Sequence, residues 1–167
     1  MCCHSRDSTR HPACVLIFGR SNSGKTTLIE RLIPRLRSRG LRVGTIKHAH
    51  HGFEMDRPGK DSWRHARAGA EAVAIISPTR TAWVIRTPEA LSYPTAVRQM
   101  DDGLDLILVE GFKRASGPKI VLAPGGGLRL DVNTARCRVG VWPDALRPGE
   151  WHQLVAFCAR WANGHPR

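Results

Sequence analysis

Eight residues near the start of the chain, from Gly19 to Thr26, have the types and spacing of a phosphate-binding loop. They fit the pattern G-x-x-x-x-G-K-[ST], in which the glycines leave room for phosphate oxygens and backbone amides point inward. The first amides of the helix that follows add a favourable helix dipole. We therefore predict that a nucleotide polyphosphate is held by Gly19, Ser21, Asn22, Ser23, Gly24, Lys25, Thr26 and Thr27.

Two side chains of this loop have distinct predicted chemistry. Lys25 brings a compact positive charge to the outer phosphates, and the Thr26 hydroxyl is a ligand for Mg²⁺. The context supports the motif, because an apolar run precedes it and apolar residues follow it at helical spacing. A glycine turn that joins a strand to a helix and binds nothing is the alternative interpretation.

A second candidate group follows the apolar run at residues 107–109. Glu110 ends this run, where a Walker B carboxylate orients Mg²⁺ or the attacking water, so we expect it to be a metal ligand and a catalytic residue. Aspartate is commoner at this position, and a residue that merely caps a loop is the alternative. Lys113 would then be a second cation near the ligand.

A histidine-rich segment, residues 47–51, follows a predicted strand. Its spacing does not suit a helical pair of zinc ligands, and no cysteine is nearby in the sequence. In parallel sheets, ligands bind at the carboxyl ends of the strands, so Lys47, His48 and His50 are candidates for contact with phosphate or base. A solvated loop is the alternative.

Two carboxylates come soon after this segment. Asp56 is a candidate for the Mg²⁺ shell, and Asp61 is a candidate for that shell or for catalysis. Residues 56–59 also match the D-x-x-G switch of small GTPases, a short pattern with two free positions. No [N/T]-K-x-D guanine motif occurs in the chain, so motifs do not identify the nucleotide base.

Strands and helices must alternate to position these groups, which predicts an α/β protein with a right-handed crossover. We expect a P-loop NTPase-type three-layer fold with a mostly parallel sheet and an antiparallel edge hairpin at residues 73–85. The predicted strands are residues 14–18, 41–47, 73–76, 81–85, 104–109, 119–122 and 138–142, and the predicted helices are residues 25–39, 61–70, 88–100 and 150–161.

The length of 167 residues and a hydrophobic content of 41% fit one globular domain with a proper core. We place that nucleotide-binding domain at residues 13–163, after a disordered basic extension at 1–12 and before a tail at 164–167. No apolar run approaches the ~20 residues of a membrane span, and the first residues lack a signal peptide's apolar core. We therefore expect a cytoplasmic location and no membrane partner.

The formal net charge of +12 indicates an anionic ligand or partner. The positive residues are spread along the chain, and there is no pattern of stacking aromatic residues, which disfavours nucleic acid. The five cysteines are scattered and lack a C-x-x-C pair, so they predict no disulfide framework.

The combination of these motifs resembles the molybdopterin-guanine dinucleotide biosynthesis protein B (MobB) family. Besides the phosphate loop, the resemblance rests on residues 45–51, 59–64, 68–70 and 108–113, and it covers about residues 13–163 in order and spacing. The chain differs from the family in its basic N-terminal extension and in a divergent segment from about 123 to 149.

The resemblance implies a homodimeric P-loop protein that binds GTP and Mg²⁺ and hydrolyses GTP poorly. Proteins of this family are adaptors in the last step of molybdenum cofactor synthesis. They assist the guanylyltransferase that joins GMP to molybdopterin. By the same resemblance, residues 19–27 are the nucleotide loop, and Asp56, Asp61 and Glu110 are acidic positions near the metal and phosphates.

A P-loop kinase or phosphotransferase acting on a small acceptor is the alternative function. In that case Glu110 or Asp61 would be the base, and arginines would clamp the phosphates. Such an enzyme should carry an arginine-bearing lid that closes over the phosphates, and the sequence shows no unambiguous one.

Overall fold

The computed structural model describes residues 11–164 apart from six short gaps, and over residues 131–141 it describes the backbone alone. The gaps are residues 50–51, 55, 101–102, 124–126, 133–134 and 142–145. The predicted extension and tail lie almost wholly outside the described residues, so those boundaries stay predictions.

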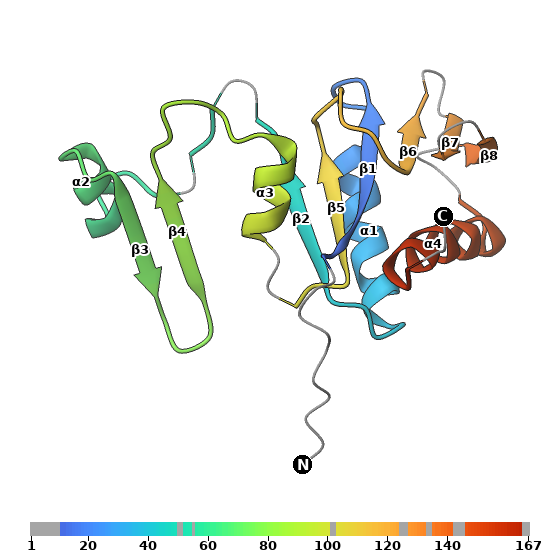
Figure 1. Cartoon of the computed structure of the whole chain (residues 1–167), viewed down its shortest axis with the longest axis horizontal. Coiled ribbons are helices and arrows are strands. Elements are labelled where there is room, and N and C mark those ends of the chain that lie inside the picture. Colours follow the sequence, from blue (N-terminus) through green and yellow to red (C-terminus); the bar gives the residue numbers. More distant parts are fainter. Residues whose placement is uncertain are drawn as a thin grey trace, which may run out of the picture. The chain divides into compact units, whose positions relative to one another are not determined.

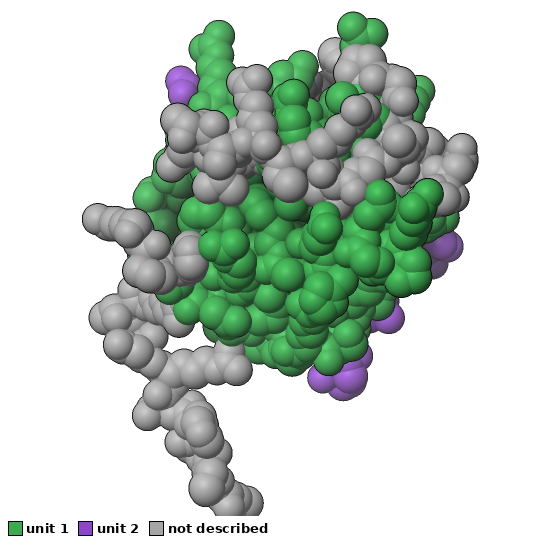
Figure 2. Space-filling model, turned by 90° about the vertical axis from the view of Figure 1, so that its right-hand side faces the viewer, with its two compact units in different colours: residues 1–48, 93–167 green, residues 49–92 purple. Residues whose placement is uncertain are grey.

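Contacts divide the chain into two compact units. The first comprises residues 1–48 and 93–167, and the second comprises residues 49–92 (Figure 2). The second unit is therefore an insertion in the first, where the sequence suggested no internal boundary.

A six-stranded sheet is the framework of the first unit (Figure 1). Its strand order is β2-β5-β1-β6-β7-β8. The first three neighbouring pairs are parallel and the last two are antiparallel, which confirms the mostly parallel sheet. The strands are β1 (Ala13–Gly19), β2 (Val43–Lys47), β5 (Leu106–Glu110), β6 (Lys119–Leu122), β7 (Gly127–Val132) and β8 (Ala135–Val141).

Helices cover both faces of this sheet. On one face, α1 (Lys25–Arg37) and α4 (Pro148–Ala162) bury their leucines against alternate residues of β1 and β5. On the other face, α3 (Tyr93–Gln99) packs against the intervening residues Leu16, Ile107 and Val109. A strand covered on both faces is apolar throughout, which explains the unbroken apolar runs of β1 and β5. The three layers predicted from the sequence are present.

The second unit contains one short helix and one hairpin. The helix is α2 (Asp61–Arg67), and β3 (Ala72–Ile76) pairs antiparallel with β4 (Thr81–Ile85). The predicted hairpin is therefore confirmed, but it forms a two-stranded sheet of its own and is not an edge of the main sheet. The antiparallel edge of the main sheet is β6-β7-β8 instead.

Two other elements differ from the sequence prediction. β7 was not predicted, and α3 begins at Tyr93, where the sequence suggested a start near Pro88. Pro94 is the second residue of α3, and proline in the first turn of a helix costs no hydrogen bond. Within the described part of the chain, no helix has both the length and the apolar character that a bilayer crossing requires.

The central strand β5 provides a test of the core. Leu108 is fully buried in it. We expect Leu108→Ala to lower the free energy of unfolding by about 2–5 kcal/mol, because the substitution removes buried methyl groups and leaves a cavity. Denaturant unfolding would measure the loss. Leu91→Ala is the control, since Leu91 is 37% exposed, and similar losses for both variants would contradict the assignment of this core.

Candidate phosphate-binding site

The predicted phosphate loop joins β1 to α1 as a tight turn. Asn22 and Gly24 have the left-handed φ values of 57° and 85°. Gly24 is the residue that precedes α1, so the loop runs directly into the helix N-terminus. Such a turn directs successive backbone N–H groups toward one point, which suits an anion.

Gly19 determines how closely this loop folds on itself. A Cβ atom at this position would overlap the Ser23 hydroxyl oxygen and would lie 3.2 Å from the Leu122 carbonyl oxygen. A side chain at this position would therefore displace the Ser23 hydroxyl and press against Leu122.

The Ser23 hydroxyl indicates that the loop binds a ligand with hydrogen-bonding atoms. Its Oγ atom is buried and has no hydrogen-bond partner among the residues that the structure describes. A buried polar atom without a partner is costly in a folded protein. A phosphate oxygen would supply the absent partner, so the loop fits a polyphosphate.

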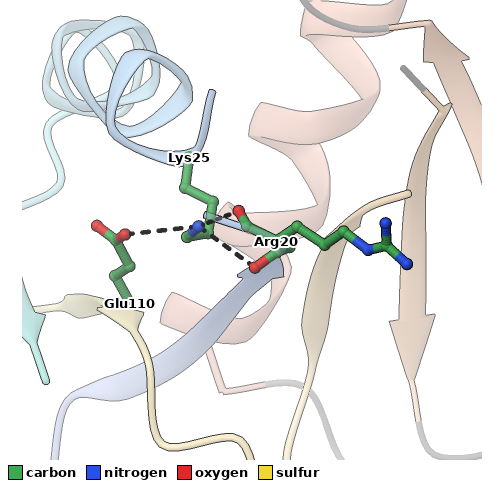
Figure 3. Close-up of polar contacts among 4 residues, drawn as sticks. Arg20, Lys25 and Glu110 are labelled. Carbon is green, nitrogen blue, oxygen red and sulfur yellow. Dashed lines mark hydrogen bonds and ion pairs between the residues drawn. The ribbon is translucent and has the colours of Figure 1, made fainter. Parts of the chain in front are cut away.

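Lys25 closes the loop from the first position of α1. Its ammonium group donates hydrogen bonds to the carbonyl oxygens of Gly19, at 3.3 Å, and Arg20, at 2.6 Å. The Arg20 side chain points away from this contact (Figure 3). Arg20 contributes to the site through its backbone carbonyl oxygen. The residue type in the sequence does not indicate this role, because every residue has a carbonyl group.

The Lys25 ammonium also faces Glu110. The distance from Nζ to Oε1 is 3.9 Å, and the two side chains are only 14% and 15% exposed (Figure 3). Strand pairing produces this contact, because β1 and β5 are parallel neighbours in which Ile17 pairs with Glu110. The structure therefore brings the predicted Walker B carboxylate and the predicted phosphate-loop lysine together.

The other candidate residues divide between the two units. Ser21, Asn22 and Thr26 are exposed in the loop and the first turn of α1, and Thr27 is half-buried there. Of the predicted Mg²⁺ ligands, Thr26 and Glu110 lie in the first unit, and hydroxyl and carboxylate oxygens suit this ion. No group of three or more His, Cys, Asp or Glu side chains that could hold a metal occurs among the described residues.

Asp56 and Asp61 lie in the second unit. The Asp56 carboxylate accepts a hydrogen bond of 2.8 Å from the Arg57 backbone N–H. Asp61 is the exposed first residue of α2. Their predicted metal-binding and catalytic roles stay predictions.

The histidine-rich segment begins beside Glu110. Lys47 ends β2 and pairs with Glu110, and the backbone N–H of His48 donates to the Glu110 carbonyl oxygen at 2.9 Å. His50 lies outside the described residues. Lys113 is exposed in the loop after β5. Lys47 and His48 are therefore held beside Glu110 by backbone contacts.

An aromatic residue with no predicted role lies in this region. Phe112 has a left-handed φ of 49°, and its ring stacks on the His48 ring with centroids 4.4 Å apart. The only signal in the sequence was its place after Glu110-Gly111, which does not distinguish an ordinary loop residue from a strained one.

Comparisons with known proteins connect this site to a family. The family model described as molybdopterin guanine dinucleotide synthesis protein B (MobB) matches residues 14–131. The molybdopterin-guanine dinucleotide biosynthesis adapter proteins of Haemophilus influenzae and Escherichia coli are 49% and 48% identical to this chain. Those matches cover 64% of this chain and 60% and 62% of the relatives, so the chain spans less than two thirds of their length.

A solved structure supports the same relationship. The crystal structure of Bacillus subtilis MobB matches with a TM-score of 0.56 at 35% identity, over 67% of this chain and 68% of that one. These matches confirm the resemblance found in the sequence and the fold class that it implied.

The close approach at Gly19 gives a test of the site. We expect Gly19→Ala to weaken the binding of inorganic triphosphate at least about tenfold, equivalent to about 1.4 kcal/mol, because a methyl group would fill the loop beside Ser23. Isothermal titration calorimetry would measure the affinity. Gly149→Ala is the matched control, since a Cβ there meets nothing within 4 Å. Equal affinities in the two variants would show that the loop is not the binding site.

Proposed function

Since this chain belongs to the molybdopterin guanine dinucleotide synthesis protein B family, we propose that it is a GTP-binding adaptor in molybdenum cofactor biosynthesis. The observation that carries the proposal is the phosphate loop itself. Its buried Ser23 hydroxyl has no hydrogen-bond partner in the described part of the chain, and Lys25 lies at the same loop with Glu110 beside it. The relatives that are named adapter proteins in molybdopterin-guanine dinucleotide biosynthesis support this choice of pathway.

In this proposal the loop holds the phosphates of GTP together with Mg²⁺. Lys25 exchanges its bonds with the Gly19 and Arg20 carbonyl oxygens for bonds with phosphate oxygens. Thr26 and Glu110 supply oxygens to the metal, which neutralises phosphate charge when it is bound. Lys47, His48 and Lys113 stand at or just after the carboxyl ends of neighbouring strands, where they add positive charge or hydrogen-bond donors.

We expect the protein to be at most a slow GTPase. Glu110 is the acidic side chain that contacts Lys25 at the loop, and in the GTP-bound state of this proposal it is a ligand of the metal. A carboxylate bound to Mg²⁺ is poorly placed to take a proton from an attacking water. Holding GTP is then the main task of the site, as suits an adaptor.

The proposed partner is the guanylyltransferase that joins GMP to molybdopterin, and the chain acts as a homodimer in the cytoplasm. The resemblance to the family supports these parts of the proposal, and no surface of the described residues is used for them. Pull-down of the purified guanylyltransferase by this chain, with and without GTP, would test the partnership.

Lys25 offers the most direct test of nucleotide binding. We expect Lys25→Ala to weaken GTP binding at least about a hundredfold, equivalent to about 2.7 kcal/mol, while the circular dichroism spectrum stays unchanged. The physical reason is that the ammonium is the positive group that contacts the loop carbonyl oxygens, where phosphate oxygens would bind. Arg37→Ala removes one exposed positive charge at the far end of α1 and should bind GTP normally. Unchanged affinity in Lys25→Ala, measured by calorimetry, would exclude the loop as the nucleotide site.

Base selectivity and turnover distinguish an adaptor from a kinase. We expect GTP to displace a labelled GTP analogue more strongly than ATP does, and Mg²⁺ to increase the difference in affinity. We also expect hydrolysis far below the typical kinase range of about 1–100 s⁻¹. Stoichiometric phosphorylation of molybdopterin or another small acceptor at such a rate would establish the phosphotransferase alternative and rule out the adaptor.

A further inference from the structure

Phe112 is held by two aromatic neighbours. Its ring is stacked on His48, with an interplanar angle of 20°, and is tilted against Tyr93, with centroids 5.6 Å apart and an angle of 54°. Both arrangements are favourable for aromatic rings beyond the area that they bury.

These two neighbours are the residues at which the chain leaves and re-enters the first unit. The second unit comprises residues 49–92. His48 is therefore the last residue before the insertion, and Tyr93 is the first residue after it. One side chain contacts both connections to the inserted unit.

Phe112 is also joined to Glu110 through a tight backbone turn. Gly111 has a φ of 105°, and a Cβ atom there would lie 2.7 Å from the His48 Cβ atom. The glycine thus allows His48 to lie against the turn, where the His48 N–H donates to the Glu110 carbonyl oxygen at 2.9 Å. The left-handed φ of Phe112 is strained for a residue with a side chain, and such strain persists where packing fixes it.

Tyr93 is fixed from its other side. Its hydroxyl group forms a hydrogen bond with the Cys14 thiol of β1. Burial raises the pKa of Tyr93, and burial raises the pKa of Cys14 against the smaller opposing effect of that hydrogen bond. Both groups are therefore uncharged at neutral pH. This neutral contact fastens the start of α3 to the strand that precedes the phosphate loop.

We propose that Phe112 is a positioning residue that transmits the state of the phosphate site to both connections of the inserted unit, residues 49–92. The proposal rests on the proposed nucleotide site. When phosphate takes over the Lys25 ammonium, Glu110 loses or changes its partner at 3.9 Å. Glu110 then shifts the Gly111-Phe112 turn, and the Phe112 ring carries the change to His48 and Tyr93.

Amide hydrogen exchange of the full chain, with and without GTP and Mg²⁺, tests this transmission. In the wild type we expect bound GTP to slow exchange in the phosphate loop and also at residues 46–49 and 92–97. In Phe112→Leu, which keeps apolar bulk but lacks a ring, we expect GTP to slow exchange in the loop only. Phe112→Tyr keeps the ring and should behave as the wild type.

Two further variants separate transmission from general loosening. Phe157→Leu also removes a ring that packs against the core of the first unit, and it should retain the response at both connections. Tyr93→Leu should lose the response at residues 92–97 and keep it at residues 46–49. Retention of both responses in Phe112→Leu would overturn the proposal, as would a wild type whose loop is protected by GTP while its connections are unaffected.

A measurement without nucleotide distinguishes failure of this proposal from failure of the proposed function. In the nucleotide-free protein, the His48 amide should exchange about two- to tenfold faster in Phe112→Leu than in the wild type, the range expected for loss of an aromatic pair. If GTP does not bind, the proposed function fails and this arm still decides the role of Phe112. An unchanged His48 exchange rate would sink that role even where GTP binds.

Discussion

The parallel pairing of β1 with β5 is the constraint on which the site depends. It sets Ile17 opposite Glu110, so the strand that leads into the phosphate loop ends beside the strand that presents the carboxylate. The buried residues of both strands are apolar and are covered by helices on both faces of the sheet. A slip in register by one residue would move buried side chains to the opposite face. The packing of the core therefore holds Lys25 near Glu110. The ion pair between them, at 3.9 Å, is too long to do so by itself.

The contacts of Lys25 indicate which interaction a ligand must displace. Its shorter contacts are with two backbone carbonyl oxygens, and its ion pair with Glu110 is long, at 3.9 Å. Neutral carbonyl oxygens are weaker acceptors for a cation than charged phosphate oxygens. A polyphosphate can thus replace the carbonyl oxygens at modest cost. Glu110 is the group that such a ligand repels, unless a metal ion lies between them. In the proposed function, Mg²⁺ would lie between Glu110 and the phosphates and offset this repulsion.

The parts of the structure that were predicted from the sequence are those set by local pattern. The phosphate loop, the strand before it and the strand that ends at Glu110 follow from short motifs and apolar runs. β7 was missed because the glycine-rich sequence at residues 125–127 indicated a turn, although the alternation of Leu128, Arg129 and Leu130 is typical of a half-buried strand. The separate hairpin was misplaced because strand pairing between distant segments leaves no local signal. Phe112 was overlooked because its left-handed backbone and its ring contacts exist only in the folded chain.

Topology explains why the inserted unit is connected at the ligand edge of the sheet. β2 ends at Lys47 beside Glu110, so the chain enters the insertion at the carboxyl end of a parallel strand, where ligands bind in such sheets. On its return, α3 starts with Tyr93 at the Phe112 turn, and Met100 and Leu104 after it pack over Gly44 near the start of β2. The helix therefore runs from the carboxyl edge back to the amino edge, as it must before β5 can begin. Both connections therefore meet the turn that follows Glu110, where the Phe112 ring contacts His48 and Tyr93.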